Sequence, residues 1–203
     1  MGCVHIYCGD GKGKTTAVTG MAVRMQGCGG QVVIARFLKT DGSGEVRGLK
    51  SLPGIQVIPC KKSFGFTWQM TEEQRREAAV YYEELLKKAF HMAQNVCRDE
   101  EMKKDWQERQ NQSCFKEDFT GSPNPDCQVL LVLDEIFGAV ESGLVMEESL
   151  LAFLKERPEN LEVAMTGRNP SARVKAEADY VSEIVCIKHP FKSGTAARKG
   201  IEF

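Results

Sequence analysis

The sequence predicts an α/β fold in which a mainly parallel sheet is flanked by helices on both faces. The first observation is a series of short apolar runs of strand length, rich in β-branched residues. Such runs are typical of buried parallel strands. They lie at 4–8 (VHIYC), 31–38 (QVVIARFL), 128–133 (QVLLVL) and 161–165 (LEVAM). The second observation is that helical patterns separate the runs, and this alternation favours a parallel sheet.

The helices are predicted from their start and stop signals. Thr71 and Gln74 form a capping-box pattern, and apolar residues then recur at helical spacing, so a long amphipathic helix begins there. Pro158 ends one shorter helix, and Pro170 precedes another. The predicted helices cover 14–26, 71–96, 146–156 and 170–178.

The whole chain, 1–203, is predicted to form a single domain with a polar surface insertion at about 98–126. Its length and 42% hydrophobic content are sufficient for one sizeable core. The insertion is rich in charged residues, Asn and Gln, which is typical of partly ordered surface segments. We expect Trp106, Phe115 and Phe119 to pin it to the body, with docking to a partner subunit as the alternative.

Charge and hydropathy exclude two classes of partner. The chain has 27 Lys and Arg residues and 28 Asp and Glu residues, so its formal net charge is -1. The overall electrostatic field therefore does not favour binding to nucleic acid or to an anionic membrane. No apolar run reaches the roughly 18–20 residues needed to span a bilayer, and the first residues have no signal-peptide pattern. We therefore expect a cytoplasmic protein that binds neither nucleic acid nor membrane.

The cysteines do not indicate a metal site or a disulfide framework. All eight are scattered along the chain, with no C-x-x-C and no Cys/His cluster of zinc-ligand spacing. We expect reduced, mostly buried thiols that act as small apolar side chains.

A glycine-rich stretch, CGDGKGKTT at 8–16, lies between the first predicted strand and the first predicted helix. A turn of this kind directs backbone N–H groups and a helix N-terminus at one point, where they bind an anion such as phosphate. The strict P-loop pattern requires glycine where Cys8 stands, but Gly13-Lys14-Thr15 fits its end. Lys14 is placed to reach phosphate oxygens, and Thr15 to bind Mg²⁺. The alternative is a glycine turn with solvated lysines.

Two carboxylates, Asp134 and Glu135, directly follow an apolar strand. They are therefore expected at the carboxyl edge of the sheet, where open α/β folds bind ligands and a P-loop protein holds its metal ion. Capping of a following helix is the alternative. Together with the loop, the pair predicts a P-loop NTPase-like (RecA-like) fold and a nucleotide enzyme that could phosphorylate, hydrolyse or switch.

Further motifs narrow this choice, because their order and spacing resemble one family. They are GDGKGKTT (9–16), GFTW (65–68), LDE (133–135), TGR (166–168), ADYVSE (178–183) and KHPFKSGTAARKGIEF (188–203). In this set the chain resembles the P-loop corrinoid adenosyltransferases, also called cob(I)alamin adenosyltransferases, over nearly its whole length. That family commonly has Asn where Asp10 stands.

The resemblance implies an adenosyl transfer in which cobalt(I) of a corrinoid attacks the 5′ carbon of ATP and triphosphate leaves. Cobalt(I) is itself a strong nucleophile, so the protein need only position the substrates and stabilise charge. The implied partners are ATP, Mg²⁺, a corrinoid and an electron donor such as a reduced flavoprotein, and the implied assembly is a homodimer. A P-loop kinase or ATPase, and a non-catalytic nucleotide- or corrinoid-binding regulator, stay open as alternatives.

The resemblance also assigns site residues. The predicted ATP-binding residues are Gly9, Asp10, Gly11, Lys12, Gly13, Lys14, Thr15, Thr16, Arg24 and Arg168. For Arg168, a contact to a corrin side chain or a structural salt bridge are the alternatives. The predicted metal ligands are Thr15, Glu135 and Asp134. Phe66 and Trp68 are predicted to press on the lower face of the corrin and displace its axial ligand, with core packing as the alternative. Lys14, Phe66 and Trp68 are the predicted catalytic residues.

Overall fold

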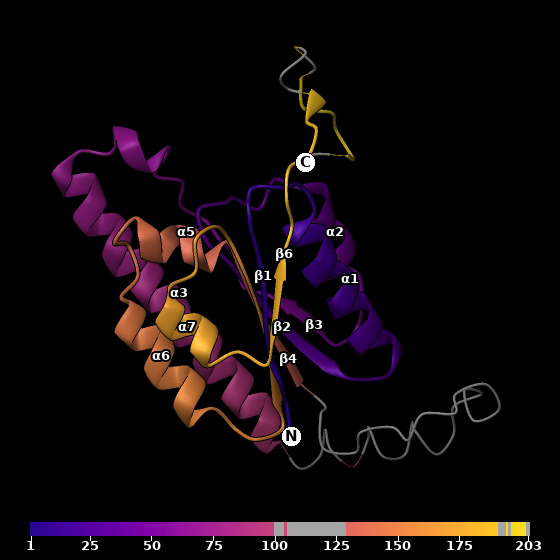
Figure 1. The fold of residues 1–203 in the computed structure, drawn as a ribbon. Coiled ribbons are helices and arrows are strands. Elements are labelled where there is room, and N and C mark those ends of the chain that lie inside the picture. Colours follow the sequence, from indigo (N-terminus) through magenta and orange to yellow (C-terminus); the bar gives the residue numbers. More distant parts are fainter. Residues whose placement is uncertain (100–103, 105–128, 191–193, 195, 202–203) are drawn as a thin grey trace.

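The computed structural model describes the chain except for residues 100–103, 105–128, 191–193, 195 and 202–203 (Figure 1). The prediction of a polar insertion at about 98–126, with its aromatic residues, lies almost entirely outside the described residues. Within the described part, no helix combines the length and the apolar character needed to cross a membrane. In that part, Cys3, Cys8, Cys60 and Cys186 are free thiols.

The centre of the molecule is a six-stranded sheet of order β3-β2-β4-β5-β1-β6, in which every neighbouring pair is parallel. This confirms the predicted parallel sheet. The strands are β1 (Val4–Cys8), β2 (Gln31–Arg36), β3 (Ile55–Val57), β4 (Val129–Asp134), β5 (Leu161–Thr166) and β6 (Tyr180–Glu183).

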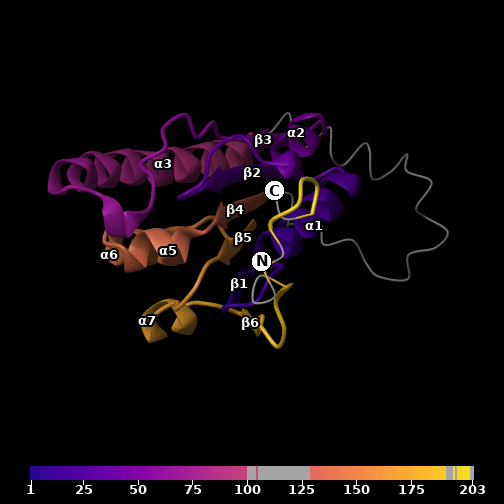
Figure 2. The ribbon, with the colours of Figure 1, turned by 90° about the horizontal axis from the view of Figure 1, so that it is seen from above.

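Helices cover both faces of this sheet, as the alternating sequence pattern predicts (Figures 1 and 2). One face carries α1 (Lys14–Gly27) and α2 (Gly44–Lys50). The other carries α3 (Glu72–Arg98), α5 (Ile136–Glu141), α6 (Glu147–Glu156) and α7 (Ala172–Ala176). All residues of β4 are buried, because alternate side chains enter the two cores. This is why the central strands read as continuous apolar runs.

The long helix α3 begins as the sequence predicts. Thr71 Oγ1 accepts a hydrogen bond from Gln74 N at 3.2 Å, and Gln74 Oε1 accepts one from Thr71 N at 3.0 Å. The predicted helix over 170–178 is shorter in the structure, because Ser171 caps it and it ends at Ala176. The sequence prediction did not include β3, β6, α2, α5 or the 3₁₀ helix η1 (Thr67–Gln69).

The strand order determines where the site can form. The segments that follow β1, β2, β4 and β5 all leave the same edge of the sheet, because the four strands are parallel neighbours in the order β2-β4-β5-β1. This carboxyl edge therefore brings together the glycine loop, the end of β4 and the end of β5.

Candidate functional site

The glycine loop joins β1 to α1 and leaves the start of α1 open to an anion. Gly13 is the N-cap of α1, with φ of 120°, and no side-chain hydrogen bond caps this end. The first turn has no acidic residue but begins with Lys14. Positive charge at a helix N-terminus opposes the helix dipole, so this end is suited to a bound anion.

Lys14 lies across the loop that it follows. Its ammonium donates hydrogen bonds to the carbonyl oxygens of Gly9 at 2.8 Å and Gly11 at 3.0 Å. Carbonyl oxygens satisfy an ammonium less strongly than phosphate oxygens do. The Lys14 ammonium is therefore held at the loop, where a bound anion can replace the two carbonyl oxygens as its hydrogen-bond partner.

The chain segment after β6, residues 184–186, closes the other side of the loop. Gly11 N donates to Ile184 O at 2.8 Å, and Ile184 N donates to Cys8 O at 2.8 Å. A Cβ atom at Gly9 or Gly11 would lie 2.5 or 2.7 Å from Ile184 O. The glycines at these positions are therefore required by the close approach of residues 184–186, in addition to any role toward phosphate.

Asp10, predicted among the ATP-binding residues, is bound to the same segment. Its carboxylate accepts a hydrogen bond from the backbone N–H of Cys186 at 3.0 Å. This bond, with smaller contributions from the charges of Arg168 and Lys14, lowers the pKa of Asp10 below its ordinary value. In the structure, Asp10 thus links the loop to residues 184–186.

The end of β4 places Asp134 beside the first turn of α1. Thr15 Oγ1 donates to Asp134 Oδ1 at 2.9 Å, and Thr166 Oγ1, at the end of β5, donates to the same oxygen at 2.7 Å. Lys39 Nζ donates to Asp134 Oδ2 and to Thr15 Oγ1, each at 2.7 Å. The Asp134 side chain is only 2% exposed, so these donors replace the water that its charge would otherwise require.

Glu135 occupies a different environment from its neighbour Asp134. It has left-handed backbone angles, φ 62° and ψ 25°, and its N–H donates to Thr166 Oγ1 at 2.8 Å. Its side chain makes no cap bond to α5, so the helix-capping alternative is wrong for this residue. Its Oε1 instead lies over Gly138, 3.2 Å from the position of a Cβ there.

The oxygen atoms around Thr15 and Asp134 fit a magnesium ion shared with phosphate. They already converge on a single cation, the ammonium of Lys39. Within the described residues, no group of three or more His, Cys, Asp or Glu side chains forms a metal cage. Mg²⁺ usually binds one or two protein oxygens and completes its shell with water and phosphate.

Phe66 and Trp68 form an exposed aromatic platform. Their rings stack with centroids 4.6 Å apart and planes 19° apart. Phe66 is 60% and Trp68 74% exposed, so the core-packing alternative is wrong for both. Large apolar side chains with this exposure mark a surface for an apolar partner or ligand.

Arg75, in the first turns of α3, holds the platform in place. Its guanidinium donates to Thr67 O at 3.0 Å and to Ser142 O, beyond α5, at 2.8 Å. Phe64 and Met70, on either side of the platform, pack against the core. The platform is thus fixed at both ends and by one cation. It lies on the segment that follows β3, and this segment leaves the carboxyl edge of the sheet because β3 is parallel to β2.

The two predicted arginines lie in different surroundings. Arg168 follows β5 and is exposed, and its charge acts on Asp10 at the loop.

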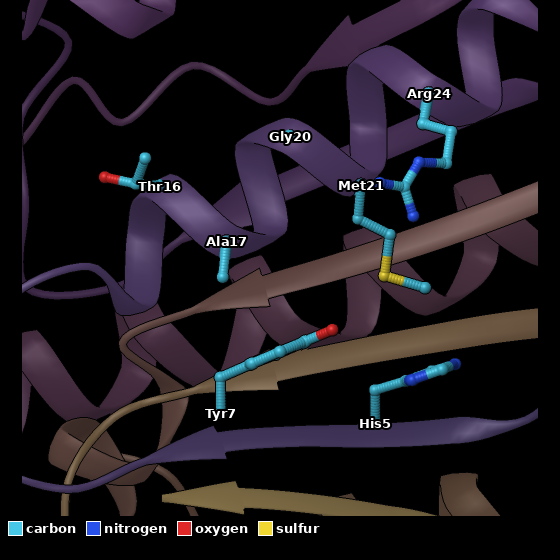
Figure 3. Close-up of a pocket in the computed structure, with 7 residues that line it drawn as sticks. All are labelled: His5, Tyr7, Thr16, Ala17, Gly20, Met21 and Arg24. Atoms are coloured by element: carbon cyan, nitrogen blue, oxygen red, sulfur yellow. The ribbon is translucent and has the colours of Figure 1, made fainter. Parts of the chain in front are cut away.

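Arg24 lies ten residues after Lys14 on α1, about 15 Å along the helix axis. It lines a pocket of about 360 Å³ between α1 and β1 with His5, Tyr7, Thr16 and Met21 (Figure 3). The structure therefore does not bring Arg24 to the lysines of the loop.

Sequence reasoning missed Lys39, Thr166 and Ile184. Each lies within a few residues of a strand's carboxyl end, in segments far apart in the sequence. For Lys39 and Thr166 the available signal was a polar or charged residue after an apolar run, as with Arg36-Phe37-Leu38-Lys39, whereas Ile184 follows no such run. That signal becomes informative only when the strand order is known.

A family model and several curated relatives indicate one family. The family model "ATP:corrinoid adenosyltransferase BtuR/CobO/CobP" matches residues 1–203. A corrinoid adenosyltransferase of Pseudomonas aeruginosa is 30% identical over 203 residues, which cover 100% of this chain and 84% of the relative. The corrinoid adenosyltransferase CobA of Salmonella typhimurium is 30% identical over 202 residues, with coverages of 100% and 86%. One from a Sinorhizobium species is 29% identical, with coverages of 100% and 80%.

Proposed function

The chain belongs to the ATP:corrinoid adenosyltransferase family, and we propose that it transfers the 5′-deoxyadenosyl group of ATP to cobalt(I) of a corrinoid and releases triphosphate. The reaction serves the biosynthesis or salvage of adenosylcobalamin. The observation that carries the proposal is the exposed Phe66–Trp68 platform, on a segment that leaves the same edge of the sheet as the glycine loop. A large planar corrin offers an apolar face that an exposed pair of stacked aromatic rings can cover.

In this reaction the two electrons of cobalt(I) form the cobalt–carbon bond, and the bond between C5′ and the triphosphate oxygen breaks. The protein's task is to hold the leaving group and neutralise its charge as that bond breaks. Lys14, already at the loop, would exchange its carbonyl partners for phosphate oxygens. Lys12 and the N–H groups of the first turn of α1 would add further donors.

We propose that Thr15 and Asp134 hold the magnesium ion of the bound nucleotide. Their convergence on one cation supports this assignment. The ion would supply additional positive charge for the leaving triphosphate. We propose that Glu135, whose carboxylate lies over Gly138, contributes through a water molecule.

The platform would act on the corrin. Phe66 and Trp68 can exclude water and an axial ligand from the lower face of the ring, because both rings are apolar, stacked and fixed by Arg75. Four-coordinate cobalt(II) is more easily reduced, so an electron donor such as a reduced flavoprotein could deliver cobalt(I) in place.

We propose further that the enzyme is a cytoplasmic homodimer. The sheet ends at β6, whose Tyr180 and Val181 are exposed together with Val185 and Ile187 in the segment that follows. Such an apolar edge supports contact with a second copy. Light scattering coupled to size-exclusion chromatography tests the assembly.

The decisive experiment for the function is a product assay. The protein is incubated with chemically reduced corrinoid, ATP and Mg²⁺, and the nucleotide, phosphate and cobalt products are separated. The proposal predicts equal amounts of triphosphate and a light-sensitive alkylcobalt product. ADP or orthophosphate without that product would instead indicate a kinase or an ATPase, and binding without turnover would indicate a regulator.

A further inference from the structure

Lys39 occupies the point between the two oxygen ligands of the proposed magnesium site. Its ammonium lies 2.7 Å from Thr15 Oγ1 and 2.7 Å from Asp134 Oδ2. Thr15 gives its own proton to Asp134 Oδ1, so the hydroxyl accepts from Lys39 and donates to Asp134. These contacts form one closed network with a single cation at its centre.

The chain holds Lys39 at this point by several contacts on either side. Phe37 N donates to Asp134 O at 2.8 Å, which continues the pairing of β2 with β4 beyond the strand ends. Leu38 then has a left-handed backbone with φ of 55°, which turns the chain. After Lys39, the buried guanidinium of Arg36 donates to Thr40 O at 2.9 Å and pairs with Asp41. A strained turn that is fixed on both sides is typical of functional segments.

On the basis of the function proposed above, we propose that Lys39 is an exchangeable cation of the active site. Before substrate binds, it neutralises the buried Asp134. When magnesium-bound ATP enters, its ammonium leaves Asp134 and Thr15 and moves onto the triphosphate. Lys39 is thus a third lysine for the leaving group, with Lys12 and Lys14.

The physical reason for the exchange is charge. Two cations that share the same two oxygens repel each other strongly in a site with little water. The ammonium can move because it is carried on a flexible four-carbon stem, and the side chain is 30% exposed. It lies beside Thr15, at the first turn of α1, where the triphosphate is proposed to bind.

A permanent structural ion pair predicts different behaviour. In that case the ammonium never reaches the triphosphate, so removal of Lys39 would leave Asp134 with its two threonine donors and would change the affinities for Mn²⁺ and for Mg-ATP in the same direction. If Lys39 is instead exchanged, its removal frees the Asp134 carboxylate for a metal ion but leaves the triphosphate with one cation fewer. The two affinities therefore move in opposite directions, and this sign difference is what the experiment measures.

The test uses Lys39→Met, Lys39→Arg and the control Lys88→Met on the exposed side of α3. Free Mn²⁺ is followed by electron paramagnetic resonance without nucleotide, and Mg-ATP affinity by calorimetry. Lys39→Met should bind Mn²⁺ at least about tenfold more tightly than wild type and Mg-ATP about tenfold more weakly. Lys39→Arg and Lys88→Met should keep the wild-type Mn²⁺ affinity. Unchanged or weaker Mn²⁺ binding by Lys39→Met would overturn the proposal.

A measurement on the wild-type chain covers the case in which Lys39→Met does not fold. The ¹⁵N resonance of the Lys39 ammonium, assigned by its loss in Lys39→Arg, should shift when Mg-ATP is added. An unchanged resonance with bound Mg-ATP contradicts the exchange. Because both measurements omit the corrinoid, a failure of adenosyl transfer and a failure of the exchange are separate results.

Discussion

Asp134 is the residue where the polar contacts of the site converge. Thr15, Lys39 and Thr166 reach it from α1, from the segment after β2 and from the end of β5. A buried carboxylate is stable only with such partners. The same contacts fix the three segments relative to one another, so one side chain both organises the carboxyl edge and attracts its cation.

Asp10 gives a prediction for the dependence of stability on pH. Its pKa is lowered in the folded protein, first by the Cys186 N–H and then by the charges of Arg168 and Lys14. Its ionised form therefore stabilises the fold above the unfolded pKa of about 4, and this contribution is lost as pH falls through the folded pKa. Asp10→Asn keeps a hydrogen-bond acceptor but removes the charge.

We expect wild type to be slightly more stable than Asp10→Asn at pH 7, and this difference to be smaller at pH 3, because it is lost as the pH falls through the lowered pKa. Urea unfolding at both values measures it. The same difference at both pH values would show that the charge of Asp10 does not act on residues 184–186.

Trp68 gives a prediction for the redox state of the substrate. Trp68→Ala removes half of the stacked platform, which is proposed to keep ligand and water from the lower face of the corrin. We expect turnover from cobalt(II) with a reductant to fall about tenfold more than turnover from pre-reduced cobalt(I). Parallel assays with the two substrates measure the ratio, and equal losses would contradict ligand displacement.

At the scale of elements, the sequence predicts the strands and helices that have a regular apolar pattern. It does not predict the elements that form only through contacts with other parts of the chain. The strands β1, β2, β4 and β5 were found because burial on both faces leaves an apolar run. The edge strand β6 has four exposed residues and therefore no such run. Its position follows from pairing with β1, which the sequence does not encode locally.

The same distinction applies to the site. The glycine loop and the Asp134-Glu135 pair could be predicted, because each is a local pattern between a strand and a helix. Lys39 and Thr166 could not, because their roles depend on β2 and β5 both lying beside β4. The stacking of Phe66 on Trp68 likewise depends on η1 and on Arg75 from the next helix.

The short element η1 gives a prediction for corrinoid binding. Arg75→Met removes the two bonds by which Arg75 joins Thr67, in the platform segment, to Ser142. Because these bonds are exposed, stability should change by no more than about 1 kcal/mol. Corrinoid affinity should fall several-fold, as measured by absorbance titration. Arg76→Met is the matched control, since Arg76 contacts Glu72 at 3.4 Å and not the platform. Equal affinities of the two variants would exclude a positioning role for Arg75.

At the scale of the whole molecule, the site connects β1, β2, β4, β5 and α1, so a nucleotide bound there should stabilise the entire sheet. At a concentration about 100 times its Kd, Mg-ATP should add about 2.7 kcal/mol to the free energy of unfolding. For a chain of this length, that raises Tm by roughly 5–10 °C. Thermal unfolding with and without Mg-ATP measures the shift. Lys14→Ala should abolish most of it, and a full shift in this variant would contradict the role of Lys14.

The closure of the glycine loop by residues 184–186 has a consequence for synthesis on the ribosome. The strand β1 emerges first, yet its sheet partners β5 and β6 are among the last parts of the chain to be made. Contacts over such sequence separations form late. A nascent chain released before residue 184 has the complete glycine-lysine motif but lacks the backbone that shapes it. Premature termination before residue 184 therefore yields chains whose glycine loop lacks the backbone that closes its other side, even though the motif lies within the first sixteen residues.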